Sequence, residues 1–243
     1  MNDLWIDHCS IEAWSDPKRW VSFFEQVQEV LASPLTHLDV NDPVRRKVAS
    51  LKDAGDFVCA FGPREDSRWV FGVFKGLGID FSIQLFRQLD RWPNSLTWYV
   101  PLSFVEKFGG RQQLQSLFDL GNQFFKPFYA FSDERAVIAS KKKSSGAIDI
   151  ETELPGVFWL TYFNAAYVSF FGKDKFKDLP GVEHGRDGSV TIVLGDNPKS
   201  VTNELREQAA ATLGKQSFVN PNDILNKPRG RFALTFQQLL AER

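Results

Sequence analysis

The residues that could hold a metal ion or act as nucleophiles are few and widely spaced. The chain has three histidines and two cysteines: His8, His37, His184, Cys9 and Cys59. A structural zinc ion takes three or four ligands, usually from close pairs such as C-x-x-C or H-x-x-x-H. None of these spacings occurs, and the adjacent His8 and Cys9 point apart in regular structure. We therefore expect no metal site and no cofactor.

A serine nucleophile is not indicated either. The stretch GRDGS, residues 185–189, differs from a G-x-S-x-G elbow, and Asp187 with Gly188 predicts a hairpin turn before a strand that starts at Ser189. A catalytic pair of His184 with Asp187, or with Cys9 or Cys59, stays open, since such partners meet only in the folded chain. The simpler interpretation places Cys59 in a buried strand and His184 on an exposed turn.

Three carboxylates alternate in the segment IDIETELPG. If this segment is extended, Asp149, Glu151 and Glu153 lie on one face. An acid pair for general acid–base catalysis needs burial, whereas this polar loop predicts exposed acids that could dock a basic partner. The charged turn residues His184, Arg186 and Asp187 complete the candidate partner-binding groups.

The composition excludes several classes of protein. The net charge of −1 gives no general reason for binding nucleic acid or an anionic membrane. The first residues, MNDLWIDHCSIEAW, lack the basic start of a secretory signal, and two cysteines cannot form a disulfide framework. We therefore expect a cytoplasmic protein. The run Lys141–Lys143 has no interleaved aromatic residues and is typical of a solvated loop.

Helical periodicity is strongest in three segments. Asp16 and Pro17 begin a helix through residues 18–33, and residues 111–125 form another. A third runs from Asn197-Pro198 to Gly214. A further helix is predicted from Asp42-Pro43 to Gly55.

Short runs rich in β-branched and aromatic residues indicate strands. They are DFVCAFG, SRWVFGVF, IDFSIQLF, SLTWYVP, AVIAS, VFWLTYF and SVTIVLG. The predicted fold is α+β: a mostly antiparallel sheet with helices packed against it, in a single domain over residues 1–243. The segments starting at Trp98 and Trp159 resemble each other weakly and suggest two repeated strand–helix halves.

The most apolar stretch is GVFWLTYFNAAYVSFFG, residues 156–172. Its 17 residues are fewer than a membrane span needs, and Asn164 interrupts them. Residues 157–163 predict a central strand covered on both faces, after which Asn164 caps a short helix that Gly172 ends. The stretch is therefore predicted to be core.

The segment 153–195 resembles bacterial immunity proteins encoded beside polymorphic toxins and type VI secretion effectors. In these proteins a Pro-Gly-aromatic-Trp strand precedes a Tyr-Phe pair, a helix with an aromatic-Val step, and a glycine-bearing turn. Asn164 stands where these proteins often have glycine. The matching positions are Pro155, Gly156, Trp159, Tyr162, Phe163, Val168, Gly172 and Gly188.

The resemblance implies a protein without enzymatic activity that binds one cognate toxin and covers its active site. A cytoplasmic toxin such as a nuclease is favoured, and against its basic site Asp149, Glu151 and Glu153 would be docking groups. Two alternatives are a small hydrolase that uses His184 with Asp187 or a cysteine, and a scaffold that binds a small apolar ligand. The oligomeric state is left open.

Overall fold

The structure, a computed structural model, describes residues 3–74, 76–107, 110–141, 149–220 and 232–242. These residues divide into two compact units, one over Asp3–Pro127 and one from Phe128 onward. Each unit combines an antiparallel sheet with helices, which confirms the predicted α+β class. The expectation of a single domain over residues 1–243 stays a prediction, because compactness does not say whether either unit folds without the other.

The sheet of the first unit has the strand order β2-β3-β4-β5-β1, and all its neighbouring strands are antiparallel. Val70 lies opposite Ile83, and Trp98 lies opposite both Phe81 and Ile6. The strands are β1 (Asp3–Ser10), β2 (His37–Asp39), β3 (Ser67–Phe74), β4 (Ile79–Phe86) and β5 (Asn94–Pro101).

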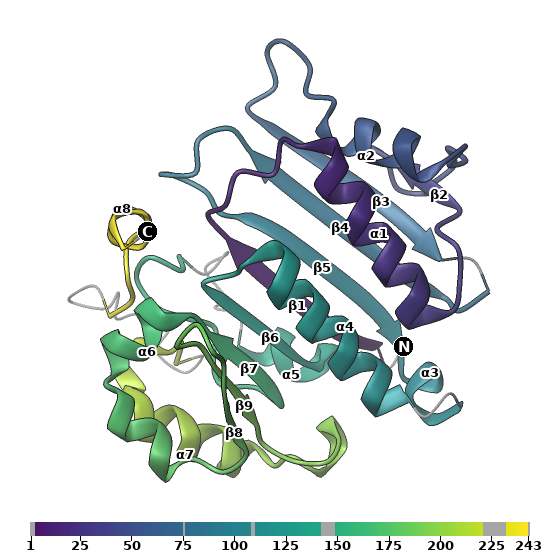
Figure 1. Cartoon of the computed structure of the whole chain (residues 1–243). Coiled ribbons are helices and arrows are strands. Elements are labelled where there is room, and N and C mark those ends of the chain that lie inside the picture. The colour runs from purple at the N-terminus through teal and green to yellow at the C-terminus, as the bar shows by residue number, and fades with distance from the viewer. Residues whose placement is uncertain (1–2, 75, 108–109, 142–148, 221–231, 243) are drawn as a thin grey trace. The chain divides into compact units, whose positions relative to one another are not determined.

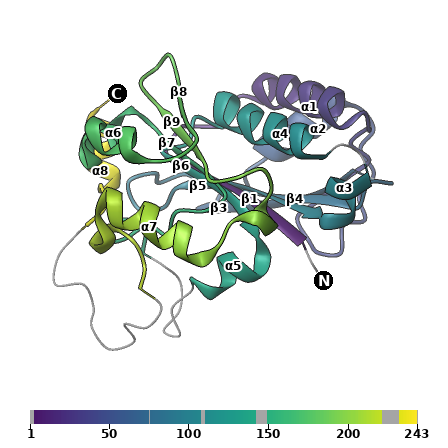
Figure 2. The ribbon, with the colours of Figure 1, turned by 90° about the horizontal axis from the view of Figure 1, so that it is seen from below.

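Helices α1 (Pro17–Leu31) and α4 (Gly110–Phe125) lie across one face of this sheet, and α2 (Leu51–Cys59) packs beside α1 (Figure 1). Figure 2 shows the three helices on the same side of these strands. Phe24 of α1 meets Phe81 with ring centroids 5.8 Å apart, and Phe23 meets Trp98 at 6.2 Å. A short helix, α3 (Leu102–Lys107), joins β5 to α4. The predicted helix at 111–125 is confirmed.

The start of α1 is also confirmed. The Asp16 carboxylate accepts a hydrogen bond from the Lys18 backbone N–H at 2.9 Å, and Pro17 occupies the first turn. The next predicted helix is wrong in its bounds. The Asp42-Pro43 bond is cis, and the helix begins only at Leu51, after Ser50 caps it. Gly55 does not end the helix but lies inside it. It lets α2 approach α1 closely, since a Cβ at this position would meet the Pro17 carbonyl oxygen at 2.5 Å.

Two of the predicted strands are wrong, and four strands were not predicted: β1, β2 and those at Tyr129–Glu134 and Val182–His184. DFVCAFG begins as the end of α2, because its apolar positions also fit the helical face that packs on α1. AVIAS forms helix α5 (Arg135–Ser140), and the strand lies just before it. β1 was not predicted, because polar His8 and Ser10 occupy inward positions of its alternating pattern.

The second unit has the strand order β6-β7-β9-β8, again antiparallel. The strands are β6 (Tyr129–Glu134), β7 (Leu160–Phe163), β8 (Val182–His184) and β9 (Val190–Val193); the α-helices are α5, α6 (Ala165–Phe171), α7 (Asn203–Gly214) and α8 (Phe236–Ala241). Pro198 starts a separate short 3-10 helix, so α7 begins later than predicted, after the Thr202 cap.

Most of the apolar stretch 156–172 is core, as predicted; Ala165, Ser169 and Phe170 are exposed. Every residue of β7 is buried, and the strand lies between β6 and β9. The Asn164 side chain accepts a hydrogen bond from the Tyr167 backbone N–H at 3.0 Å, and α6 ends before Gly172. The two weakly similar segments both pass from a strand into a helix, as β5–α3 and β7–α6.

Candidate protein-binding surface

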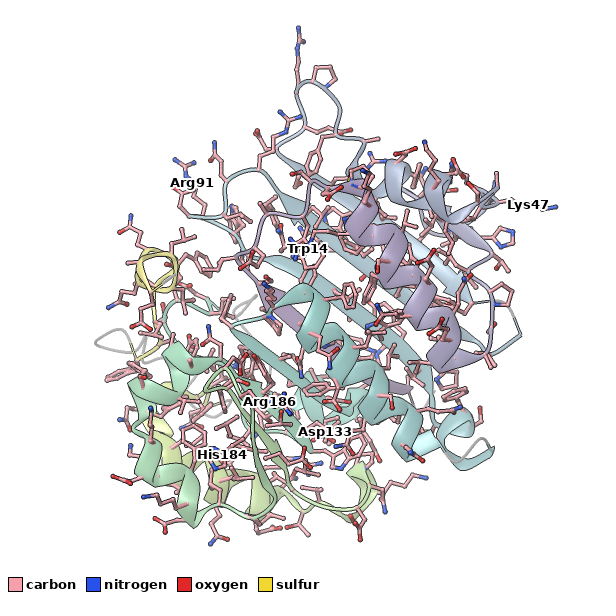
Figure 3. The ribbon with its side chains drawn as sticks, viewed as in Figure 1. Trp14, Lys47, Arg91, Asp133, His184 and Arg186 are labelled. Carbon is pink, nitrogen blue, oxygen red and sulfur yellow. The ribbon has the colours of Figure 1, made fainter. Side chains whose placement is uncertain are left out.

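The predicted hairpin turn forms between β8 and β9. The Gly185 backbone N–H donates to the Ser189 carbonyl oxygen at 2.9 Å, and Gly188 has a φ of +83°. Its side chains at His184 and Arg186 are exposed (Figure 3). The hairpin therefore presents charged groups to solvent, as a partner-binding loop would.

His184 and Asp187 are not joined by a hydrogen bond among the described residues. The Asp187 carboxylate instead accepts hydrogen bonds from the backbone N–H and the hydroxyl of Ser189, at 3.0 and 2.5 Å. Partial burial opposes ionisation of Asp187, but these hydrogen bonds hold its pKa below the usual range. The carboxylate therefore orders the turn, and a His–Asp catalytic pair is not assembled here.

The three alternating acids do not share an extended face, which corrects the sequence prediction. Residues 150–152 form a turn, in which the Asp149 carboxylate accepts from the Glu151 backbone N–H and the Thr152 hydroxyl. Glu151 accepts from the Phe236 backbone N–H at 2.7 Å, at the start of α8. Glu153 is buried. Of the three acids only Asp149 is exposed; the start of α8 holds Glu151. The predicted loop at 142–148 lies outside the described residues.

The cysteines are free thiols and poor candidates for nucleophiles. Burial raises the pKa of Cys9 well above its usual value, and burial with nearby Asp16 and Asp56 raises that of Cys59 to about 11. Both thiols are therefore protonated at neutral pH. They lie in the first unit, whereas His184 lies in the second.

His8 has a structural position under α4. Its Nε2 lies 3.1 Å from the Phe118 carbonyl oxygen, and burial lowers the pKa of the ring to about 4. Gly121 makes room for the ring, since a Cβ there would lie 2.2 Å from Nε2. The described residues contain no group of three or more His, Cys, Asp or Glu that could hold a metal ion, and no described helix could cross a membrane.

A buried ion pair in the second unit was missed by the sequence analysis. Arg206 of α7 donates to both carboxylate oxygens of Asp133, at 2.7 and 2.8 Å (Figure 3 labels Asp133). Asp133 also accepts from the Trp159 backbone N–H, and Arg206 donates to the Val201 carbonyl oxygen. All these partners are satisfied, so the pair is structural. In the sequence, the only indication of this pair is that the charged Arg206 stands beside the row of apolar residues of α7.

A pocket of about 350 Å³ lies beside this pair, and two of its three lining cations are already engaged; the third, Lys215, is exposed. Lys141 forms an ion pair with Glu207, and Arg206 is held by Asp133. A second pocket of about 350 Å³, in the first unit, is lined mainly by apolar groups such as Trp14, Phe61 and Leu85. Neither pocket offers converging free polar groups for a cofactor.

The sheet of the first unit has a second face, opposite α1 and α4, which we call the open face. Because side chains alternate along each strand, the register places one set of residues on it. These are Asp3, Trp5, Asp7 and Cys9 of β1, His37 and Asp39 of β2, Ser67, Trp69, Phe71 and Val73 of β3, Asp80, Ser82, Gln84 and Phe86 of β4, and Ser95, Thr97, Tyr99 and Pro101 of β5.

Aromatic side chains are prominent on the open face. The Trp69 side chain is 45% exposed and stacks against Phe71, with centroids 6.1 Å apart. Trp92, in the loop after β4, is 60% exposed and stacks on Phe86. Large exposed aromatic groups that are held in place are the usual anchors of protein–protein interfaces. The open face is therefore the strongest candidate for a binding site.

Hydrogen bonds order the polar part of the open face. The Thr97 hydroxyl donates to the Asp7 carboxylate at 3.1 Å, and the Ser82 and Tyr99 hydroxyl oxygens lie 3.3 Å apart. The sequence analysis missed this surface because both alternating positions of β3 are apolar or aromatic. An excess of aromatic residues on both faces of a strand is the signal that could have indicated it.

The comparisons with known proteins give a fold but no family. No protein-family model matches the sequence, and the search of curated proteins found no match. A solved structure of the type VI secretion system (T6SS) protein PA0821 of Pseudomonas aeruginosa is similar to this chain. The TM-score is 0.63 at 13% sequence identity, and the alignment covers 90% of this chain and 73% of that one. The chain therefore shares its fold with a T6SS protein.

Proposed function

We propose that this chain is an immunity protein, which binds a cognate T6SS toxin in the cytoplasm and covers the toxin's active site. The observation that carries the proposal is the open face, on which Trp69 and its stacked neighbour Phe71 are available to a partner. The similarity of fold to PA0821 and the resemblance of residues 153–195 to immunity proteins support it. In this proposal the chain has no enzymatic activity of its own.

The motif that carries the resemblance is itself core. Trp159, Phe163 and Val168 are all buried, so these residues describe a fold lineage and leave partner binding to other surfaces. The open face could supply most of the contact area for that role. At about 4.8 Å between strands and 3.3 Å per residue, five strands of up to eight residues cover roughly 600 Å². A stable interface takes about 800 Å² from each partner, so adjoining loops would supply the remainder.

Co-expression tests the proposal. The partner to try is the C-terminal domain of a large secreted protein encoded beside this chain. Cells that produce this domain alone should die, and cells that also produce the chain should survive. Death in both cases, with the chain soluble and abundant, would contradict the proposed function for that toxin.

A single-residue control separates binding from catalysis. If the chain acts by binding, His184→Ala should protect as well as the wild type, because His184 has no catalytic partner among the described residues. Loss of protection by a folded His184→Ala protein would instead favour the hydrolase alternative.

A further inference from the structure

We infer that the open face binds a positively charged protein surface, with Trp69 and Phe71 as apolar anchors and with Asp3, Asp80 and the exposed Asp42, in the loop after β2, as acceptors for lysine or arginine side chains. This inference rests on the proposed function and specifies the partner's chemistry. The docking groups are then aspartates of the first unit, in place of Asp149, Glu151 and Glu153 of the second.

The aromatic part of the surface suits arginine. The Trp69 and Phe71 rings stack at an interplanar angle of 21°. An arginine guanidinium packs well on such ring faces, and it keeps its donors free for carboxylates. The chain already uses this contact internally, since the Arg46 guanidinium lies 4.2 Å from the Phe57 ring centroid. A partner arginine could therefore stack on the aromatic rings and donate hydrogen bonds to the carboxylates at the same time.

The acidic part of the surface centres on Asp80. This exposed residue lies on β4, opposite Val73 of β3 and Tyr99 of β5. Phe71 is two residues before Val73 on the same face of β3. Partial burial and the nearby carboxylates of Asp42 and Asp3 raise the pKa of Asp80. Among the described residues the charges that act on it are thus both negative. A cation from a partner would relieve this repulsion.

Two other carboxylates of the open face are already engaged. Asp39 accepts the backbone N–H groups of Arg45 and Arg46, and Asp7 accepts from the Thr97 hydroxyl. They still contribute negative potential, but they are less free to reorient. Asp3, Asp42 and Asp80 are therefore the better acceptors.

No lysine or arginine occurs among the strand residues that define the open face. Three cations lie at its margins: Arg45, whose backbone N–H donates to Asp39, and Lys47 beside β2, and Arg91 in the loop before β5 (Figure 3 labels Lys47 and Arg91). Lys47 bridges to His37 and is three strand spacings from Asp80, about 14 Å, which exceeds the Debye length in physiological salt. The field over the centre of the face is therefore negative.

This negative field argues against other occupants. A second copy of the chain that paired through the same face would place aspartates against aspartates. Nucleic acid and an anionic membrane carry the same sign of charge and would be repelled. A basic protein surface is the occupant that both the charges and the aromatic anchors fit.

Binding to the toxin domain encoded beside this chain tests the inference. We would measure association and dissociation rates by biolayer interferometry at about 50 and about 300 mM salt, where screening differs strongly. Trp69→Thr should weaken the affinity about 30-fold, as loss of an interface anchor does. Asp42→Asn with Asp80→Asn should slow association about tenfold at low salt and flatten its salt dependence.

Matched controls come from the second unit. Phe170 is 42% exposed, close to the 45% of Trp69, and Asp174 is an exposed aspartate on a short 3-10 helix. Phe170→Ala and Asp174→Asn should bind like the wild type. Circular dichroism and the unfolding midpoint should confirm that each variant is folded.

The outcomes separate the two proposals. If the wild type binds and protects but the Trp69 and aspartate variants bind equally well, the inference is wrong and the proposed function stands. If binding through this face yields a dimer of the chain, a second copy is the occupant and the inference is also wrong. If the wild type neither binds nor protects, the proposed function fails for that toxin and the inference fails with it.

Discussion

The sheet of the first unit is closed on one face and open on the other, whereas β6 and β7 of the second unit are buried along almost their whole length. Both regions are rich in aromatic residues. In the second unit these residues fill the core, and on the open face they meet solvent. The comparison teaches that aromatic density marks a binding surface only where the fold leaves the rings uncovered.

Carboxylates differ between the same two regions. Asp133 is fully buried and receives two hydrogen bonds from Arg206, whereas Asp80 is exposed and lies near other acids. The first must be paired to be tolerated in the core. Asp80 has only negative charges acting on it among the described residues, so a cation from a partner would stabilise it, as in a binding site. Four predictions test this contrast.

The largest effect should come from a buried tryptophan of the first sheet. Trp98→Ala should lower the free energy of unfolding by about 3–5 kcal/mol, because it removes a large side chain and leaves a cavity between α1 and the sheet. The matched variant Trp69→Ala should lower it by less, about 1–2 kcal/mol, since that ring is already half exposed. Urea unfolding measures both, and equal losses would contradict the distinction between the faces.

Breaking the buried pair of the second unit should cost nearly as much. Asp133→Ala leaves the Arg206 guanidinium buried without its partner and should lower stability by about 3–5 kcal/mol. The double variant Asp133→Leu with Arg206→Met should recover a large part of that loss, because no charge stays unpaired. If Asp133→Ala costs less than about 1 kcal/mol, the pair is not the structural element that its geometry indicates.

His8 should make stability depend on pH. Its pKa is lowered from 6.5 to about 4, so as the pH falls the unfolded chain binds the proton first and stability is lost between pH 6.5 and about 4. From pH 7 to 4.5 the wild type should lose about 2.5 kcal/mol more than His8→Gln, which keeps a donor for Phe118 and does not titrate. Urea unfolding at both pH values measures the difference, and parallel losses would disprove it.

The smallest effect is expected on the hairpin of the second unit. His184→Ala should leave the unfolding midpoint unchanged, because the side chain is exposed and makes no hydrogen bond among the described residues. Arg186→Ala is the matched control on the same turn. A clear loss of stability in either variant would indicate that the hairpin is packed more closely than its exposure suggests.

Local patterns predicted most of the elements. The cap at Asp16, the strands β3, β4 and β5, and the hairpin at Asp187-Gly188 follow from residues close together in the chain. Four strands, β1, β2, β6 and β8, were not predicted, and for two of them the physical reason is clear. β1 places His8 at an inward position, where only the Phe118 carbonyl of a distant helix makes a polar ring acceptable. β6 contains the buried Asp133 next to its last residue, and the partner of Asp133, Arg206, lies 73 residues away.

By itself, then, the sequence determined the α+β class, the mostly buried character of residues 156–172 and the turn at Asp187-Gly188, because hydrophobic period and turn chemistry act over a few residues. His184, predicted on that turn, is instead the last residue of β8. Only the tertiary structure decided which face of the first sheet is covered. Both faces of β3 are apolar or aromatic, so the strand alone does not distinguish them. The choice is made by α1 and α4, which lie far apart in the sequence but pack side by side on the sheet and leave Trp69 and Asp80 on the other face.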